Sequence, residues 1–589
     1  MIKNIKEEIK LLIKERTREL WGGPASPPAS PNRGESLGGQ IELPDFEVER
    51  PANDFGDYAV NIAFVLSKKL QMPPQKIAEI LAVELNKYKP GDISRIEVVG
   101  GYINFFLDQS FLQSQLIQIH KQGLKFGKSN IGKKHKVIVE YSSVNIAKPM
   151  HAGHLRTTLL GDAIANILEF SGYKVIRWNY LGDWGTQFGK VIAAYKKWSG
   201  KEKVKANPIK ELVSLYVMFN QEEKEHPELQ QEGQDEFRKL EAGDKENRKL
   251  WKWFVDETKE NLKNIYGLLD IKFDSYVGES FYENKLKPLI DKLIIKGIAK
   301  EGEGGALIIN LDAFDLPPAL IRKSDGATLY MTRDIANLEY RLEKYKPAKI
   351  LFVVSSEQNL HFRQLFEVAE ILRLKSAELR HINYGLVLGE DNKKLSTRGG
   401  NAITADDMIF ESIERADKIV REKNTDMSEK QYKDIARIVG VGALKYAMLK
   451  DNTRSDIVFS WQKILDFKGD SGPYLQYTYA RLHGILRKAS SGGSADPSLL
   501  TEKSELAIIK HLIDFPDTIE DSARKNITNN LALYLYELTS LTNHFYETAS
   551  IIKDENIPRR NARLILIETV ANVLKIGLNL LGMGVLNKI

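Results

Sequence analysis

The first hundred residues alternate between helical and strand-like patterns of apolar positions. Between Ile2 and Leu12 apolar residues recur every three or four positions, which is the spacing of one helix face. Helical periodicity returns over residues 59–85 with a break at two adjacent prolines, and residues 96–107 alternate like two paired strands around two adjacent glycines. We therefore expect a small α+β domain over residues 1–125.

A different pattern begins at Lys136, where short apolar runs alternate with helical stretches. This alternation predicts a parallel sheet whose strands are joined by crossover helices, as in α/β folds. The expected strands are residues 137–141, 174–180, 350–354 and 382–388. We assign residues 133–405 to this α/β domain and expect its polar segment at about 196–265 to be a helical insertion.

The remainder of the chain is expected to be helical. Beyond about residue 405 strand patterns nearly vanish and helical periodicity continues to the end, which predicts an all-helical domain over residues 406–589. Residues 22–40 and 489–498 are rich in glycine, proline and serine. These two segments predict flexible loops.

Composition limits the chemistry of the 589-residue chain. It has no cysteine, which excludes disulfides, thiolate catalysis, iron–sulfur clusters and zinc sites built on sulfur. The formal charge of +6 permits a polyanionic partner without requiring one. The sequence shows neither a run of about 18 apolar residues nor a leader pattern, so we expect a cytoplasmic protein with no membrane partner.

The motif His151-Ala152-Gly153-His154 lies between an expected strand and an expected apolar helix. Two imidazoles at a helix N-terminus can bind a phosphate and stabilise charge that develops on it, and the absent side chain of Gly153 lets a flat base or sugar approach the backbone. Two alternatives remain, a purely structural pair and a metal site. A metal site would need a further ligand.

A basic loop, Lys393-Lys394-Leu395-Ser396-Thr397-Arg398-Gly399-Gly400, follows the last expected strand. Such a loop can close over a polyphosphate, although by itself it is usually a solvated turn. The loop and the histidine motif both follow strands of one parallel sheet. Open α/β sheets bind their ligands at this edge, which favours a shared site.

Several segments together resemble the arginyl-tRNA synthetases. Residues 139–189 contain HAGH, which is similar to the HIGH signature of class I synthetases. The segments LYMTRD at 329–334, SEQNLH at 356–361, KLSTR at 394–398 (similar to the KMSKS signature) and YLYELTSLTNHFYE at 534–547 resemble the same family in the same order. The N-terminal GYINFFL resembles the family's additional N-terminal domain, so the resemblance covers nearly the whole chain.

The resemblance implies three domains and a reaction. The parts are a Rossmann-type catalytic core, an N-terminal tRNA-binding α+β domain and an all-helical C-terminal anticodon-binding domain. The reaction would join L-arginine to its tRNA through arginyl-adenylate, with ATP as its Mg²⁺ complex and AMP and pyrophosphate as products. We expect a monomer with no protein-bound metal.

The resemblance also assigns residues to ATP. His151, Gly153, His154, Lys394 and Ser396 would bind it, and Lys148 would neutralise the α-phosphate. Arg398 would join Lys394 in contacting the phosphates. Two departures, Thr397 and Gly399, stand where relatives commonly carry lysine and leave the individual roles in the loop open.

Arginine requires acceptors for a planar cation that donates five hydrogen bonds. By resemblance, Asp334, Tyr330 and Glu140 would surround the guanidinium, and Ser143, Asn145 and Gln358 would hold the amino and carboxylate end. For tRNA, the matching positions are Tyr102 and Asn104 in the N-terminal domain and Tyr474, Gln476 and Tyr477 near the C-terminal domain. Core packing is the alternative for these five residues.

Two rival functions remain. Another class I synthetase, such as one for glutamine or cysteine, would need a different pocket, and the cysteine enzyme normally needs a zinc site that this chain cannot build from thiolates. The other rival is a tRNA-binding paralogue without catalysis. The intact HAGH, Lys148 and Asp334 argue against it.

Overall fold

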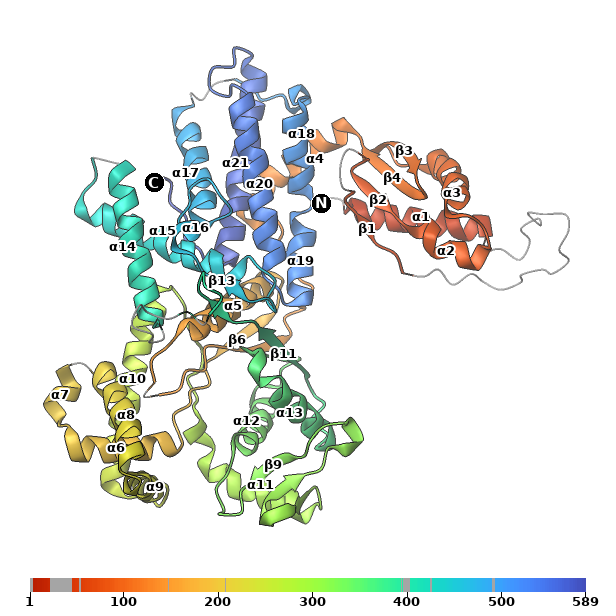
Figure 1. Cartoon of the computed structure of the whole chain (residues 1–589). Helices are drawn as coiled ribbons and strands as arrows, with labels where there is room; N and C mark the ends of the chain where they lie inside the picture. Colours follow the sequence, from red (N-terminus) through yellow and green to blue (C-terminus); the bar gives the residue numbers. More distant parts are fainter. Residues whose placement is uncertain are drawn as a thin grey trace, which may run out of the picture. The chain divides into compact units, whose positions relative to one another are not determined.

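The chain forms two compact units in a computed structural model (Figure 1). The structure describes residues 4–21, 45–51, 55–146, 148–206, 208–393, 395, 403–423, 426–489 and 493–588. The first unit comprises residues 1–126, 482–515 and 538–573, and the second comprises residues 127–481, 516–537 and 574–589. The expected loop at 22–40 lies outside the described residues.

The N-terminal part of the first unit is the expected α+β fold. Ile5, Ile9 and Ile13 are buried on one face of the first helix, which confirms the periodicity. A four-stranded antiparallel sheet has the order β1-β2-β4-β3. The elements are α1 (Ile5–Trp21), β1 (Val48–Glu49), β2 (Tyr58–Val60), α2 (Ile62–Leu70), α3 (Pro74–Tyr88), β3 (Ile93–Val99), β4 (Tyr102–Leu107) and α4 (Gln109–Gln122).

The hairpin between β3 and β4 depends on Gly100 and Gly101. Their φ angles are 58° and 89°, in the left-handed region that other residues rarely adopt. A Cβ atom on Gly101 would also lie 3.0 Å from the ring of Phe64. The turn therefore fixes which residues of β4 face outward, and Tyr102 is the first of them.

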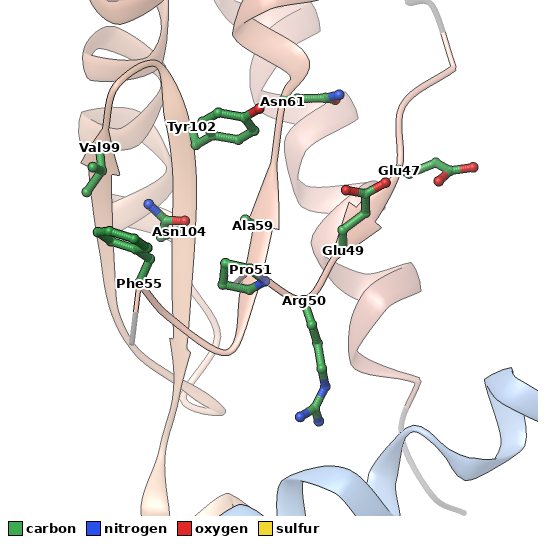
Figure 2. A pocket seen from close by; sticks show the side chains of 10 residues that line it. All are labelled: Glu47, Glu49, Arg50, Pro51, Phe55, Ala59, Asn61, Val99, Tyr102 and Asn104. Atoms are coloured by element: carbon green, nitrogen blue, oxygen red, sulfur yellow. The ribbon is translucent and has the colours of Figure 1, made fainter. Parts of the chain in front are cut away.

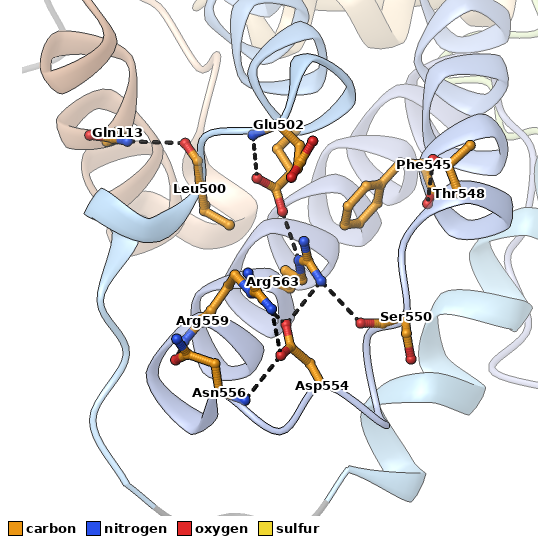
Figure 3. Close-up of polar contacts among 11 residues, drawn as sticks. Gln113, Leu500, Glu502, Phe545, Thr548, Ser550, Asp554, Asn556, Arg559 and Arg563 are labelled. Carbon is orange, nitrogen blue, oxygen red and sulfur yellow. Dashed lines mark hydrogen bonds and ion pairs between the residues drawn. The ribbon is translucent and has the colours of Figure 1, made fainter.

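Buried charges tie the C-terminal helices of the first unit together. Arg563 donates from Nε to Glu505 at 2.7 Å and from a terminal nitrogen to Asp554 at 2.9 Å (Figure 3). Arg559 makes two further hydrogen bonds to the Asp554 carboxylate. These contacts lower the pKa of Asp554, chiefly through the hydrogen bond from Arg559. The buried charges of this network are balanced only while each carboxylate keeps its arginine partner.

We expect Glu505→Ala to destabilise this unit. The substitution would remove one of the two carboxylates that hold the buried guanidinium of Arg563, and the loss of a hydrogen bond to a charged group typically costs about 1.5–3 kcal/mol. Circular dichroism during heating should show a clear fall in the unfolding temperature. Arg524→Ala, which breaks the exposed i,i+4 pair with Glu520, should change it little. Equal shifts for both variants would contradict the role of the network.

The second unit contains the expected parallel sheet. Its order is β11-β10-β5-β6, and every neighbouring pair is parallel. From β5 the chain runs outward to β6 and later returns to β10 on the other side, so the strand order reverses between β5 and β10. Ligands bind α/β sheets at the carboxyl edge of such a reversal. The strands are β5 (Lys136–Glu140), β6 (Lys174–Trp178), β10 (Lys349–Ser355) and β11 (Glu378–Tyr384).

The last expected strand, residues 382–388, was placed wrongly. Strand β11 begins at Glu378, and the later residues form a separate short strand, β12 (Val387–Leu388). This strand pairs with β13 (Ile457–Val458), which lies in the stretch expected to be helical. The apolar run Gly385–Leu388 suggested one continuous strand because periodicity cannot reveal a change of pairing partner.

Helix α5 (Ala152–Phe170) lies against the sheet and is buried along most of its length. Gly161 allows this close approach, because a Cβ atom there would overlap the ring of Tyr141. Two further helices, α12 (Tyr330–Tyr345) and α13 (Asn359–Ile371), pack with the sheet in one apolar core that includes Ile138, Phe352 and Leu365.

Two insertions separate β6 from β10. The expected helical insertion is present but starts at Thr186, ten residues earlier than the pattern indicated. A three-stranded antiparallel sheet follows, which the sequence did not reveal because its strands have only three or four residues. The elements are α6 (Thr186–Trp198), α7 (Lys201–Ala206), α8 (Pro208–Glu225), α9 (Glu228–Glu241), α10 (Lys245–Leu268), α11 (Glu283–Ile295), β7 (Ala299–Glu301), β8 (Leu307–Ile309) and β9 (Ala319–Arg322).

Helices make up nearly all of the C-terminal region, as expected. None of the helices within the described ranges is both long and apolar enough to cross a membrane. The helices are α14 (Ala405–Lys423), α15 (Glu429–Leu449), α16 (Trp461–Ile464), α17 (Gly472–Lys488), α18 (Lys503–Ile513), α19 (Phe515–Lys525), α20 (Asn529–Thr548) and α21 (Ile557–Leu580).

Candidate active site

The loop after β5 is strained where it enters the site. Ser142 and Ser143 have φ angles of 71° and 46°, which non-glycine residues rarely adopt and which cluster at functional sites. Asn145 pairs through its backbone with Gly182, beyond the end of β6. The Ser143 hydroxyl oxygen is buried without a hydrogen-bond partner among the described residues. The loop therefore presents an unsatisfied polar group at the sheet edge.

The two histidines of the HAGH motif cap α5 through their backbone and side chains. His151 Nδ1 accepts from the Gly153 amide at 3.1 Å, and His154 Nδ1 accepts from the His151 amide at 3.4 Å. When Nδ1 is an acceptor, the proton of a neutral imidazole sits on Nε2. Each histidine therefore uses its Nδ1 to cap the helix and keeps an N–H donor at Nε2. Across the described part of the chain, no group of three potential metal ligands is found.

His154 is neutral at physiological pH. Burial, with added repulsion from His151 and Lys148, lowers its pKa to about 3. Lys148 is exposed, and its ammonium lies 5.6 Å from the ring centre of Tyr216 in α8. Positive charge beside the helix N-terminus thus comes from Lys148, whereas His154 supplies a neutral hydrogen-bond donor.

Both ends of the basic loop are anchored beside α5. Arg156 of α5 is buried and donates to the carbonyl oxygens of Gly385 and Thr453 at 2.6 and 3.1 Å, which fixes the segment leading into the loop. On the far side, Thr404 forms a bridge with His151. Lys394, Ser396 and Arg398 themselves lie outside the described residues. Their predicted roles stay predictions.

A cluster of acids lies at the carboxyl end of β5. Glu140, the last residue of β5, forms a buried ion pair with Arg341 of α12. Burial raises the pKa of Glu140 and Arg341 opposes this effect. Asp334 is two helical turns before Arg341 and accepts a hydrogen bond from His361 Nε2 at 2.6 Å. The two predicted carboxylates are therefore neighbours, and each has a cation or histidine of the chain against it.

A third acid, Glu279, was not predicted. Burial raises its pKa to about 8, against the effect of Arg333, and the charge of Asp334 raises it further. The Glu279 carboxylate lies 3.9 Å from Arg333. One Glu279 oxygen and the Tyr180 hydroxyl are buried without a hydrogen-bond partner in the described parts of the chain. No periodicity in the sequence marks Glu279, because it lies in a short 3₁₀ turn after a long insertion.

Two further residues predicted to bind the substrate arginine, Tyr330 and Gln358, lie at the starts of α12 and α13. Tyr330 is the first residue of α12, is 62% exposed and interacts electrostatically with Tyr216. Tyr216 also lies near Lys148, so helix α8 of the insertion borders the phosphate side of the site. Gln358 is exposed at the start of α13, three residues before His361. The structure thus brings these predicted residues to one edge of the sheet.

The first unit holds a separate pocket of about 340 Å³ on the surface of its N-terminal sheet (Figure 2). Tyr102 is 47% exposed at this pocket, and its ring lies 5.0 Å from that of Phe64. The Asn104 side-chain nitrogen is buried without a partner among the described residues. The lining residues are Glu47, Glu49, Arg50, Pro51, Phe55, Ala59, Asn61, Val99, Tyr102 and Asn104.

Of the three predicted contacts on α17, the structure removes one. Gln476 is fully buried and its amide donates to the carbonyl oxygens of Ile438 and Gly584, so the prediction that it contacts RNA is corrected to a packing role. Tyr474 is partly buried near Tyr536. Tyr477 is also partly buried, with two cations near its ring, Lys423 at 5.6 Å and Arg481 at 5.1 Å.

Comparison with known families accounts for nearly the whole chain. Residues 115–461 match the family "tRNA synthetases class I (R), catalytic domain". Residues 3–107 match the "Arginyl tRNA synthetase N terminal domain", and residues 475–589 match the "DALR anticodon binding domain". The three matches follow one another in the order that the sequence motifs indicated.

Individual relatives agree with these matches. The arginine–tRNA ligase of Clostridioides difficile (strain 630) is 41% identical over 93% of this chain and 95% of its own length. That of Alkaliphilus metalliredigens is 38% identical over 92% and 95%. The arginyl-tRNA synthetase structures from Plasmodium falciparum and Thermus thermophilus each align with a TM-score of 0.79, at 26% and 27% identity, over 100% and 99% of this chain and 100% of their own chains. The chain belongs to the arginyl-tRNA synthetases, a family of class I aminoacyl-tRNA synthetases.

Proposed function

We propose that the edge of the parallel sheet activates L-arginine and transfers it to tRNA. In the first step a carboxylate oxygen of arginine attacks the α-phosphorus of ATP, and pyrophosphate leaves. In the second, a hydroxyl of the terminal adenosine of tRNA attacks the arginyl carbonyl, and AMP leaves. The observation that carries this proposal is the cluster of three acidic side chains at the switch point, beside the helix N-terminus that bears the histidine pair.

The acid cluster suits a guanidinium. A cation that never deprotonates in proteins is best held by a carboxylate that can accept two hydrogen bonds. Arg341 already pairs with Glu140, so Asp334 takes the direct contact, with Glu279 and the hydroxyl of Tyr330 beside it. A neutral isostere could not make the charged hydrogen bonds to Asp334, which gives the site its selectivity.

The histidine pair and Lys148 suit the phosphates. The backbone amides at the start of α5 favour an anion. His154 is neutral at neutral pH and adds one N–H donor for a phosphate oxygen. Lys148 adds a full positive charge to stabilise the pentavalent phosphorus. Lys394, Ser396 and Arg398 would approach from the loop whose ends are fixed beside α5. Ser143 and Asn145 would hold the amino and carboxylate end of arginine, with Gln358.

The tRNA would be contacted at two further places. The pocket at Tyr102 and Asn104 offers an exposed ring for stacking and an amide donor for a base edge. On α17, Tyr477 with Lys423 and Arg481 combines a ring with cations, as single-stranded RNA contacts require. We assign both groups to tRNA binding from their chemistry and from the family positions that they match.

The substrate complex and the setting complete the proposal. ATP would enter with Mg²⁺, which is then part of the substrate. The protein would act in the cytoplasm as a monomer. Sedimentation of the purified chain, with and without tRNA, would measure its oligomeric state directly.

We expect the purified chain to attach labelled arginine to total tRNA, and Asp334→Asn to abolish most of this activity. The amide keeps the shape but removes the charge that faces the guanidinium. The loss in kcat/KM for arginine should be on the order of 10³-fold or more. Glu339→Gln, on the same helix at its surface pair with Lys292, is the matched control and should change little. Undiminished charging by Asp334→Asn would contradict the pocket.

We expect Lys148→Ala to slow adenylate formation far more than it weakens arginine binding. The ammonium is assigned to the phosphorus, so its loss should lower the rate by about 10²- to 10³-fold while the KM for arginine stays nearly constant. Single-turnover formation of arginyl-adenylate in the presence of tRNA measures both quantities. Lys201→Ala, an exposed lysine of the insertion, is the control. An equal loss in rate and affinity would refute the assigned role.

We also expect arginine activation to require bound tRNA, as the family resemblance implies. Exchange of labelled pyrophosphate into ATP should be weak with arginine alone and should rise on addition of arginine-accepting tRNA. A tRNA lacking its terminal adenosine would separate the effect of tRNA binding from that of aminoacyl transfer. Robust exchange in enzyme freed of tRNA would count against this expectation.

A further inference from the structure

His361 has no role in the reaction as assigned so far, yet it contacts the central carboxylate of the arginine pocket. Its Nε2 donates to Asp334 Oδ2 at 2.6 Å. The two side chains come from the first turn of α13 and the second turn of α12, and both are about one-fifth exposed. The contact therefore lies at the open side of the acid cluster, where a ligand enters.

The hydrogen bond competes with the substrate. A guanidinium grips a carboxylate best through both oxygens, and His361 already occupies one of them. Of the neighbouring acids, Glu140 has a permanent cation in Arg341, and Glu279 is largely protonated at neutral pH because burial raises its pKa to about 8. Among the described residues, the ion-pair partner of Asp334 is His361. Unlike an arginine, a histidine can lose its positive charge near neutral pH by releasing a proton.

We propose that protonated His361 is the counter-ion of Asp334 in the empty pocket, and that bound arginine takes over this charge and expels the proton. His361 is thus a positioning residue rather than a catalytic one. It keeps the pocket close to charge balance in both states. The inference deepens the proposed function and depends on arginine binding at Asp334.

The electrostatic surroundings agree with this exchange. Burial lowers the pKa of His361. The hydrogen bond to Asp334 and the charges of Asp334 and Glu140 raise this pKa by more, so it lies above the ordinary histidine value of 6.5. On the other side, the ring of His381 stacks on Phe362, and the pKa of His381 is lowered by burial. The ionisable groups that act on His361 are Asp334 on α12, Glu140 on β5 and His381 on β11, and Arg341 and Glu279 in turn act on Glu140 and Asp334.

The sign of the pH dependence follows. A guanidinium placed beside the imidazolium repels it and lowers the pKa of His361 in the complex. Arginine then binds weakly where His361 is protonated and more tightly as the pH rises through the pKa of the free enzyme. The dissociation constant should fall by at most about tenfold per pH unit and become constant above that pKa.

Calorimetric titration of the full-length protein with arginine tests this exchange. At about pH 7, titrations in buffers with different ionisation enthalpies count the protons released, and we expect up to about one per arginine. In His361→Gln the amide keeps a donor to Asp334 but cannot titrate. This variant should bind arginine without proton release and with an affinity that hardly changes between about pH 6 and 8.

His381→Gln is the matched control and should release protons as the wild type does. Histidine ring signals of the ¹³C-labelled wild-type protein give a check without any variant, because one imidazolium should become neutral when arginine is added. Binding without proton release, or equal release in wild type and His361→Gln, overturns the inference and leaves the arginine pocket standing. Absence of arginine binding to the wild type overturns both.

Discussion

A site for a cation must hold several carboxylates close together even when the cation is absent, and their mutual repulsion is the constraint on which this structure depends. The chain meets it in two ways: Arg341 pairs with Glu140 and His361 with Asp334, whereas burial keeps Glu279 largely protonated, with a pKa of about 8. Helix α12 carries Arg341 together with Asp334, so the helix sets the geometry of the pocket. Burial without such partners would neutralise the acids and remove their ability to select a guanidinium.

The phosphate end of the same sheet edge follows the opposite rule. Here the protein collects donors and positive charge, and His154 stays neutral because burial, with added repulsion from His151 and Lys148, lowers its pKa. One topological feature, the reversal of strand order between β5 and β10, places both ends together. The helical insertion adds Tyr216, whose ring centre lies 5.6 Å from the Lys148 ammonium, so a segment outside the sheet borders this end of the site.

Contiguous motifs led to most of the candidate residues, and the residues that escaped prediction show why. His151, His154 and Lys148 stand together in the sequence, and Asp334 lies inside a recognisable segment. Glu279 follows a long insertion and Arg341 looks like any cation of an amphipathic helix, so only their partners in space reveal them. Gln476 failed in the other direction, since an aromatic-rich helix face can serve packing or RNA, and burial decides which.

By itself the sequence determined the parallel sheet, the helical C-terminal region and the motifs at the sheet edge, because apolar periodicity and short motifs are local properties. It could not determine that β11 and β12 are separate strands, that the β7–β9 sheet exists, or that His361 rests against Asp334. Those features depend on which groups meet across hundreds of residues. Their energies come from charge pairing and burial, which exist only once the chain has folded.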